Sequence, residues 1–445
     1  MRFFQSWCLC LFAGLLAGCG GAPPVTSSGT PATQTVASST TTDSAVQADA
    51  VSKSTMVPET PHMADAFVDS VGINVHLSYY GTLYGDNFAA VESLLKNLGV
   101  RHVRDGTDNG NQSICSEDQA LALAGIHFDV ISSSSLGTSD IASWLGCIGT
   151  AAEAVEPSNE YDISGDPNWA ADLRAFQQAL WSQYGPQMPV LSPALTTEAG
   201  YGALGSLAST ISRGNMHDYF AGRNPGTWGW GGTDTFGTYG SLAWNIAIAQ
   251  QVAGATPMIA TETGYSDQTD AYAVPAVTKQ HYILRTLLEH WNAGVVRTYL
   301  YELVDEGGLP FSHYGLTDGA GKAKPVYTAL KHLLANLSDP GSAFTPTPLA
   351  YAISAAASVH HALLQKRNGT YALILWDEVP EWDPTTSSAV AVSAQKVVLK
   401  FPQAPRSLQL TTFGNAGGTT TRAVTASTSV TLQATGSPMI LAITR

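Results

Sequence analysis

Apolar runs that suit buried strands alternate with segments of helical periodicity from residue 67 to residue 336. One helical segment places apolar residues on a single face over 91–98 and ends at Gly99. The strand-like runs cover residues 71–77, 100–104, 126–131, 155–160, 189–195, 216–220, 257–263 and 295–303. Strands alternating with helices predict an α/β fold, a (β/α)8 TIM barrel over residues 61–339, with an open doubly wound sheet as the alternative.

The pattern changes after residue 340. Asn368-Gly369 stands between apolar runs at 362–364 and 371–376, which is a hairpin signal. Further strand-like runs follow at 397–399, 408–410, 430–432 and 440–443. Short strands at close intervals predict an antiparallel β-sandwich over residues 340–445, for which we expect a structural role.

The first 19 residues have the pattern of a targeting signal. Arg2 precedes an apolar stretch that ends in Leu16-Ala17-Gly18-Cys19 and is too short to span a membrane as a helix. This ending resembles the bacterial lipobox, which implies acylation of Cys19 and a membrane anchor in the cell envelope, outside the cytoplasm. An ordinary signal peptide is the alternative. Residues 20–60 are rich in Ser, Thr and Ala, which predicts a disordered tether.

Charge and cysteine content narrow the possible partners and compartment. The 445 residues carry a formal net charge of −14 and show no Lys/Arg-rich run, which argues against nucleic acid as a partner. Beyond residue 19 the chain holds Cys115 and Cys147. In an oxidising compartment they form either a disulfide or two buried thiols. Cys115 is expected to start a helix and Cys147 to end the next, at opposite ends of the barrel.

Two of the apolar runs end on a glutamate. They read Ala154-Val155-Glu156-Pro157-Ser158-Asn159-Glu160 and Met258-Ile259-Ala260-Thr261-Glu262-Thr263-Gly264-Tyr265. Barrel enzymes place their chemistry at the carboxyl ends of parallel strands, and a carboxylate pair supplies the acid and the nucleophile or base that glycoside hydrolysis needs. The separation of 102 positions between the two glutamates (262 − 160) fits three βα units of about 34 residues, near the ~31 of a typical barrel.

Asn159-Glu160 at the expected fourth strand and Glu262 at the expected seventh resemble the clan A glycoside hydrolases, which are retaining (β/α)8 enzymes. The resemblance covers residues 71–336 and implies Glu160 as acid/base and Glu262 as nucleophile. It implies hydrolysis of β-glycosidic bonds in an oligo- or polysaccharide by double displacement. Glu156-Pro157-Ser158 departs from the Glu-Gly-Pro that is frequent in the clan.

The alternative function is that of a surface glycan-binding lipoprotein with a degenerate, non-catalytic barrel. The presence of both Glu160 and Glu262 favours the enzyme, because a degenerate barrel is expected to have lost one of them. The chain has no Cys/His spacing for zinc, no Walker loop and no EF-hand loop. We therefore expect a carbohydrate partner, no metal and no cofactor.

The resemblance adds substrate-binding candidates at other strand ends. It implies that Asn159 bonds the sugar 2-hydroxyl and that Arg104 supports the nucleophile. A turn role for Asn159 and a salt bridge from Arg104 to Asp105 are the alternatives. His76, Tyr301 and Glu302 are added because they end the expected strands one and eight.

His217 and Tyr219 lie two residues apart on the expected sixth strand, so one face carries both. In the clan, a tyrosine here keeps the nucleophile ionised. Trp228 and Trp230 follow in a glycine-rich loop and are candidates for stacking on sugar rings. The alternative for all four side chains is core packing.

Overall fold

The computed structural model describes residues 56–106, 112–132, 136–268, 272–306 and 313–445. Its central sheet has seven parallel strands in the order β6-β5-β4-β3-β11-β10-β7. Their bounds are β3 Val71–Asn74, β4 His102–Gly106, β5 His127–Ile131, β6 Ala152–Glu156, β7 Gly214–His217, β10 Met258–Thr263 and β11 Arg297–Leu300. The parallel α/β architecture predicted from the sequence is confirmed.

Two isolated parallel bridges join the edges of this sheet. Val190 bridges to Val155 of β6, and Leu191 bridges to Arg213 next to β7. The run predicted as strand five over 189–195 therefore closes the barrel, but it is reduced to these two positions. Pro189 and Pro193 flank them, and proline has no N–H to give to a strand ladder.

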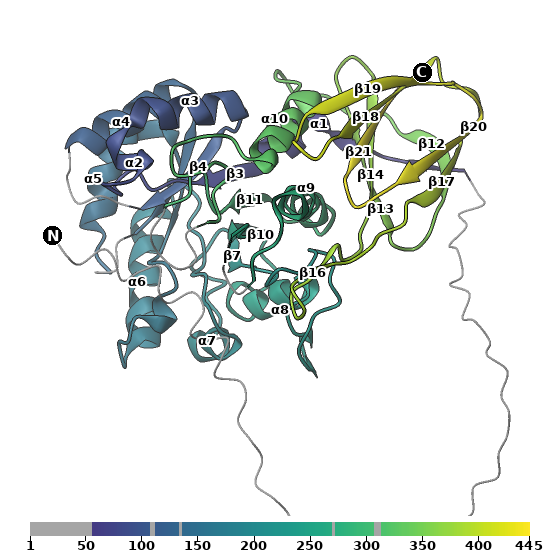
Figure 1. Ribbon diagram of the computed structural model, residues 1–445. Helices are drawn as coiled ribbons and strands as arrows, with labels where there is room; N and C mark the ends of the chain where they lie inside the picture. The colour runs from purple at the N-terminus through teal and green to yellow at the C-terminus, as the bar shows by residue number, and fades with distance from the viewer. Residues whose placement is uncertain (1–55, 107–111, 133–135, 269–271, 307–312) are drawn as a thin grey trace, which may run out of the picture.

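Helices surround the barrel sheet (Figure 1). They are α1 Ala64–Asp69, α2 Leu83–Asp86, α3 Phe88–Leu98, α4 Gln112–Leu123, α5 Ser139–Ile148, α6 Trp169–Tyr184, α7 Glu198–Leu204, α8 Leu242–Ala253, α9 Ala276–Asn292 and α10 Pro325–Leu337. In α3 the Asn87 side chain caps the amino end and Gly99, at φ 84°, ends the helix. None of the described helices has the length and apolar character needed to cross a membrane.

Cys115 of α4 and Cys147 of α5 form a disulfide, with their Cα atoms 5.6 Å apart. The expectation that they lie at opposite ends of the barrel was wrong. The bridge therefore joins the first turn of α4 to the last turn of α5.

A unit of two sheets, antiparallel except for the parallel pair β2–β13, packs beside the barrel (Figure 1). The sheet orders are β1-β12-β17-β20 and β19-β18-β21-β14-β13-β2. The bounds are β1 Val57–Glu59, β2 His62–Met63, β12 Leu349–Ser354, β13 Val359–Gln365, β14 Tyr371–Asp377, β17 Gln395–Lys400, β18 Ser407–Phe413, β19 Thr419–Val424, β20 Ser429–Ala434 and β21 Met439–Thr444. The antiparallel sandwich and its hairpin at Gly369 were predicted correctly.

Strand β14 joins the two halves of the molecule. Its Leu373 and Leu375 belong to the core between the two sandwich sheets. The alternate Ile374 and Trp376 belong to the core shared with the barrel helices. Because successive strand side chains point to opposite faces, β14 is buried on both, between the sandwich interior and α9.

The amino-terminal strands also belong to the sandwich sheets. Residues 57–59 of β1 pair with β12, and residues 62–63 of β2 pair with β13, before α1 enters the barrel. These residues were assigned to the end of the tether and the start of the barrel. The signal segment, Cys19 and the tether up to residue 55 lie outside the described residues.

Candidate active site

Glu160 lies at the carboxyl end of the barrel but beyond the strand that leads to it. The strand predicted over 155–160 ends at Glu156, because Pro157 follows and cannot continue the ladder. Glu160 takes a left-handed conformation, with φ 43° and ψ 45°, and its residue is only 7% exposed. Its Oε1 is 2.8 Å from Nδ1 of His217 at the end of β7.

Glu262 sits inside β10 and accepts two hydrogen bonds. Arg104 donates from Nη1 to Oε1 at 2.7 Å, and the Tyr219 hydroxyl donates to Oε2 at 2.8 Å. One carboxylate oxygen from Glu262, one from Glu160 and one ring nitrogen from His217 all lie within 4.8 Å of one another. The structure thus brings the two sequence-predicted glutamates together.

The environments of the two glutamates shift their pKa values in opposite directions. Burial raises the pKa of Glu160, and the nearby Glu262 adds to this, against an opposing effect from His217. Burial also acts to raise the pKa of Glu262, but His217, Arg104 and Tyr219 outweigh it and hold that pKa below the ordinary value. Two carboxyl groups whose pKa values are shifted in opposite directions suit a mechanism that needs one protonated acid and one ionised carboxylate.

Arg104 is the centre of a buried hydrogen-bond cluster. Besides Glu262, its guanidinium contacts the carboxylate of Glu156, Oδ1 of Asn74 at 3.0 Å and Oδ1 of Asn159 at 2.8 Å. The Asn159 amide is thereby oriented with its oxygen on Arg104 and its NH2 group turned elsewhere. The alternative of a simple Arg104–Asp105 bridge does not describe this arrangement.

A chain of hydrogen bonds fixes the orientation of the His217 ring. Nδ2 of Asn215 donates to Glu156 at 2.6 Å, and the Thr261 hydroxyl donates to Oδ1 of Asn215 at 2.8 Å. Since that hydroxyl proton is used, Oγ1 of Thr261 accepts from Nε2 of His217, 3.0 Å away. This network assigns the proton to Nε2, so Nδ1 of a neutral His217 faces Glu160 as an acceptor.

His76, Tyr301 and Glu302 form a second polar wall beside Glu262. The main-chain nitrogen of Tyr301 donates to the oxygen of Thr263 at 2.8 Å, and the His76 and Tyr301 rings are 5.5 Å apart. Nε2 of His76 is 3.5 Å from Oε2 of Glu302. Burial lowers the pKa of His76 to about 4.

Glu302 is fully buried. Tyr84 donates to its Oε2 at 3.3 Å, while Oε1 has no hydrogen-bond partner in the described part of the chain. Burial and the neighbouring Glu306 raise the pKa of Glu302 well above its usual value. A ligand with hydroxyl groups would satisfy Oε1.

The two tryptophans have different surroundings. The Trp230 ring packs edge-on against Tyr239 at 5.6 Å and lies 4.6 Å from the Arg223 guanidinium carbon. Trp228 is 91% exposed, so core packing does not explain it.

The sequence pointed to both glutamates but not to the residues that orient them. Asn74, Glu156, Asn215, Thr261 and Tyr84 were missed. The available signal was chemical: the first four are polar residues buried on barrel strands, and a buried polar side chain needs a partner.

Donor geometry alone also permits a metal at two places. Glu160, His217 and Glu262 form one cluster, and His76, Glu302 and Glu306 form another with donor atoms equally close. Neither cluster has the closed tetrahedral set of a structural zinc site. The expectation of no metal and no cofactor stays a prediction.

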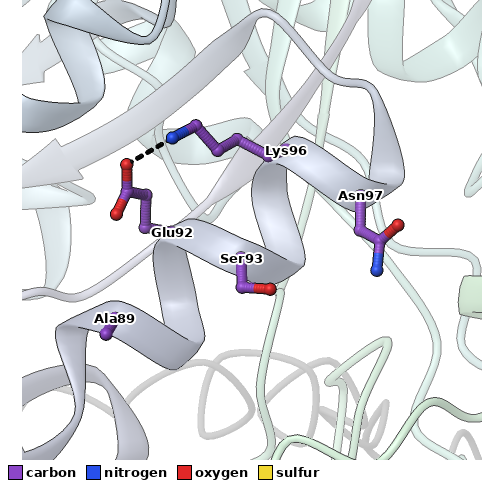
Figure 2. Close-up of a pocket in the computed structure, with 5 residues that line it drawn as sticks. All are labelled: Ala89, Glu92, Ser93, Lys96 and Asn97. Carbon is purple, nitrogen blue, oxygen red and sulfur yellow. Dashed lines mark hydrogen bonds and ion pairs between the residues drawn. The ribbon is translucent and has the colours of Figure 1, made fainter.

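The hollow in Figure 2 is a different feature. It is lined by Ala89, Glu92, Ser93, Lys96 and Asn97 of α3, with an ion pair of 2.6 Å between Glu92 and Lys96. Neither Glu160 nor Glu262 lines this hollow, and all five lining residues belong to one helix, so we assign it no role in the chemistry.

Comparison with known proteins identified the fold. No family model and no curated protein matches the sequence. A family 39 glycoside hydrolase from the gut symbiont Bacteroides cellulosilyticus WH2 matches in structure with a TM-score of 0.58 and 14% identity, over 86% of this chain and 83% of that one. A family 17 β-1,3-glucanosyltransferase from Rhizomucor miehei matches with a TM-score of 0.45 and 13% identity, over 57% of this chain and 95% of that one. The first likeness shows that this chain has the fold of the clan A glycoside hydrolases, including the antiparallel region after the barrel.

Proposed function

We propose that this chain is a retaining glycoside hydrolase that cleaves β-glycosidic bonds of an oligo- or polysaccharide. The observation that carries the proposal is the proximity of Glu160 and Glu262, which have oxygens within 4.8 Å of each other. Retaining enzymes hold their carboxyl groups about 5–5.5 Å apart, whereas inverting enzymes need ~6.5–9.5 Å to admit a water. The opposite pKa shifts of the two groups support the same pairing.

In the first step the ionised Glu262 attacks the anomeric carbon. A bond forms between that carbon and the carboxylate, the glycosidic carbon–oxygen bond breaks, and the leaving oxygen takes the proton of Glu160. In the second step a water attacks the same carbon and gives its proton back to Glu160, while the bond to Glu262 breaks. Arg104 and Tyr219 hold the nucleophile ionised and oriented between turnovers.

Other polar groups are placed to bind the sugar. Asn159 has its amide oxygen held by Arg104, which leaves its NH2 group to bond the sugar 2-hydroxyl. Oε1 of Glu302 is a buried acceptor that lacks a partner among the described residues. We assign it, with His76 and Tyr301, to hydroxyl groups of the sugar ring at the cleavage site.

Product stereochemistry tests the mechanism. The protein is incubated with soluble β-1,3-glucan, β-1,4-glucan and β-1,4-xylan, and proton NMR follows the fresh product before mutarotation. We expect the β-anomer to appear first. Initial release of the α-anomer would rule out retention, and binding without hydrolysis across a wider set of β-linked glycans would favour the glycan-binding alternative.

We also propose that the protein is lipid-anchored in a bacterial envelope. The support is the sequence Leu16-Ala17-Gly18-Cys19 and the Ser/Thr/Ala-rich stretch that follows it. Mass spectrometry of the native protein is expected to find a lipid on Cys19. A mature chain that starts at any other residue would reject the anchor.

A further inference from the structure

The loop that follows β7 is held in a fixed shape. It leaves the barrel directly after Tyr219 and returns at α8. The main-chain nitrogen of Trp230 donates to the main-chain oxygen of Tyr239 at 3.0 Å, and the main-chain nitrogen of Tyr239 donates to the main-chain oxygen of Gly232 at 3.1 Å.

The tip of this loop is also fixed. Strands β8 Thr233–Asp234 and β9 Gly237–Thr238 pair there. Asp234 also accepts a 2.8 Å bond from the Trp244 indole, which ties the tip to α8.

This fixed loop presents Trp228 to solvent. The side chain is 91% exposed, although burying a tryptophan would stabilise the fold. The next residue, Gly229, has φ 97°, and a Cβ there would lie 2.4 Å from the oxygen of Tyr239. Trp228 therefore stands on a turn that only glycine permits, and its ring is available to a ligand.

A carboxylate from the sandwich is inserted at the base of the same loop. Oε1 of Glu378, just after β14, accepts from Nδ2 of Asn224 at 2.8 Å and from the nitrogen of Gly226 at 3.0 Å. The approach is close, because a Cβ on Gly226 would lie 2.2 Å from Cγ of Glu378. The anchor is thus two residues before Trp228.

Residues of β14 and α9 also hold the Glu378 carboxylate in place. Its Oε2 accepts from the Trp376 indole at 3.1 Å and lies 3.4 Å from Nε of Arg285 on α9. Trp376 and Arg285 are fully buried and Glu378 is 8% exposed. A buried carboxylate with four polar contacts has a fixed position, so through Glu378 the sandwich restrains this loop of the barrel.

We infer that Glu378 is a positioning residue of the sandwich that fixes Trp228 as a stacking platform for a sugar chain extending beyond the cleaved bond. The inference rests on the proposed function and narrows it to glycans of several units. The indole of Trp228 is almost fully exposed on the loop that follows β7, so it would meet a sugar unit outside the buried cleavage site, whereas the buried polar groups around Glu160 and Glu262 hold the sugar that is cleaved. The sandwich then contributes to the choice of polymer over short substrate.

Kinetics with two kinds of substrate test the platform. The substrates are whichever of the three soluble polymers the wild type hydrolyses and the aryl β-glycoside of the same sugar. We expect Trp228→Ala to lower kcat/KM on the polymer at least tenfold more than on the aryl glycoside, mainly through KM. Leu123→Ala, which truncates another exposed apolar side chain (90% exposed), is the control and leaves the ratio unchanged. If Trp228→Ala leaves the ratio of kcat/KM on the polymer to kcat/KM on the aryl glycoside unchanged, Trp228 is not a stacking platform.

Amide hydrogen exchange tests the anchor without reference to activity. Glu378→Ala and Asn224→Ala are each compared with wild type, and Asn224→Ala keeps the buried Glu378–Arg285 pair if the first variant fails to fold. We expect exchange at the Gly226 amide and over 226–232 to speed up at least tenfold, and the polymer preference to fall as it does in Trp228→Ala. Adding Trp228→Ala to either variant should cause no further loss.

Unchanged exchange over 226–232 in both variants would overturn the positioning role. If the wild type hydrolyses none of the polymers or glycosides, the proposed function and the polymer preference fail together. The exchange experiment on the free protein still decides the anchor in that case. Glu92→Ala, which removes a half-buried carboxylate paired with Lys96 on α3, controls for the loss of a negative charge.

Discussion

Nδ1 of His217 lies 2.8 Å from Oε1 of Glu160, and the opposite ring nitrogen is tied through Thr261 and Asn215 to Glu156. The far end of this chain fixes the proton on Nε2. The pair formed by His217 and Glu160 therefore shares a single proton, which lies either on the carboxyl or on Nδ1. General acid catalysis by Glu160 requires the carboxyl form.

The first prediction concerns the pH dependence of kcat/KM. Activity rises as pH increases through the pKa of Glu262, which is held below that of an ordinary glutamate, and falls as pH increases through the raised pKa of Glu160. His217 lowers the pKa of Glu262, so His217→Phe should move the acid limb of the profile to higher pH. The measurement is kcat/KM on an aryl β-glycoside across pH, with a circular dichroism check of folding.

His332→Phe on α10 is the control for that experiment, because it removes an imidazole from an outer helix. It should leave both limbs in place. A His217 variant whose acid limb stays unmoved, or moves to lower pH, would contradict the assigned effect of His217 on Glu262.

The second prediction concerns the hydroxyl of Tyr219, which donates to Glu262 at 2.8 Å. Tyr219→Phe removes one donor from an ionised carboxylate, and such a bond is worth about 1.5–3 kcal/mol. We expect kcat/KM to fall roughly 10- to 150-fold and the acid limb to move to higher pH, with the basic limb little changed. Tyr327→Phe, which removes a hydroxyl bonded to the oxygen of Leu94, is the matched control. Equal loss in both variants would show that the effect is structural.

The third prediction separates the roles of the two glutamates. Glu262→Gln removes the nucleophile and should abolish turnover of every substrate. Glu160→Gln should lower the first step by about 10²–10⁴ on a poor leaving group and spare an activated aryl glycoside, which needs little acid assistance. Pre-steady-state release of the aryl group measures that step alone. Glu92→Gln on α3 is the control, and equal loss of aryl release from an activated aryl glycoside in both active-site variants would refute the assignment.

The barrel and the sandwich were predictable because their signals are local. The apolar runs at 71–77, 126–131 and 257–263 each contain a barrel strand, and Asn368-Gly369 marks the β13–β14 hairpin. Strand ends were less accurate wherever proline intervenes. Pro157 ends β6 four residues before Glu160, and Pro193 limits the fifth barrel position to two bridges.

The supporting residues could not be predicted, because their partners come from distant parts of the chain. Arg104 meets Glu262 only when the barrel closes, across 158 positions, and Asn224 meets Glu378 across 154. No periodicity in the sequence encodes such pairs. Side-chain chemistry could nominate a polar residue on a buried strand, but only the fold shows which groups it contacts.

The last prediction concerns the disulfide between Cys115 and Cys147, which closes a loop across 32 positions and links α4 to α5. On the chain-entropy model, a loop of this length stabilises the fold by about 3–4 kcal/mol. Replacing both cysteines by alanine should lower the free energy of unfolding by about that amount in urea titrations, since the unfolded chain regains its freedom. Because neither cysteine belongs to the hydrogen-bond network of Glu160 and Glu262, kcat/KM at 25 °C should stay near wild type. A single-site variant, Cys115→Ala, should be destabilised to the same extent and leave Cys147 reactive to a thiol reagent, whereas full thiol reactivity in the unreduced wild type would contradict the bridge.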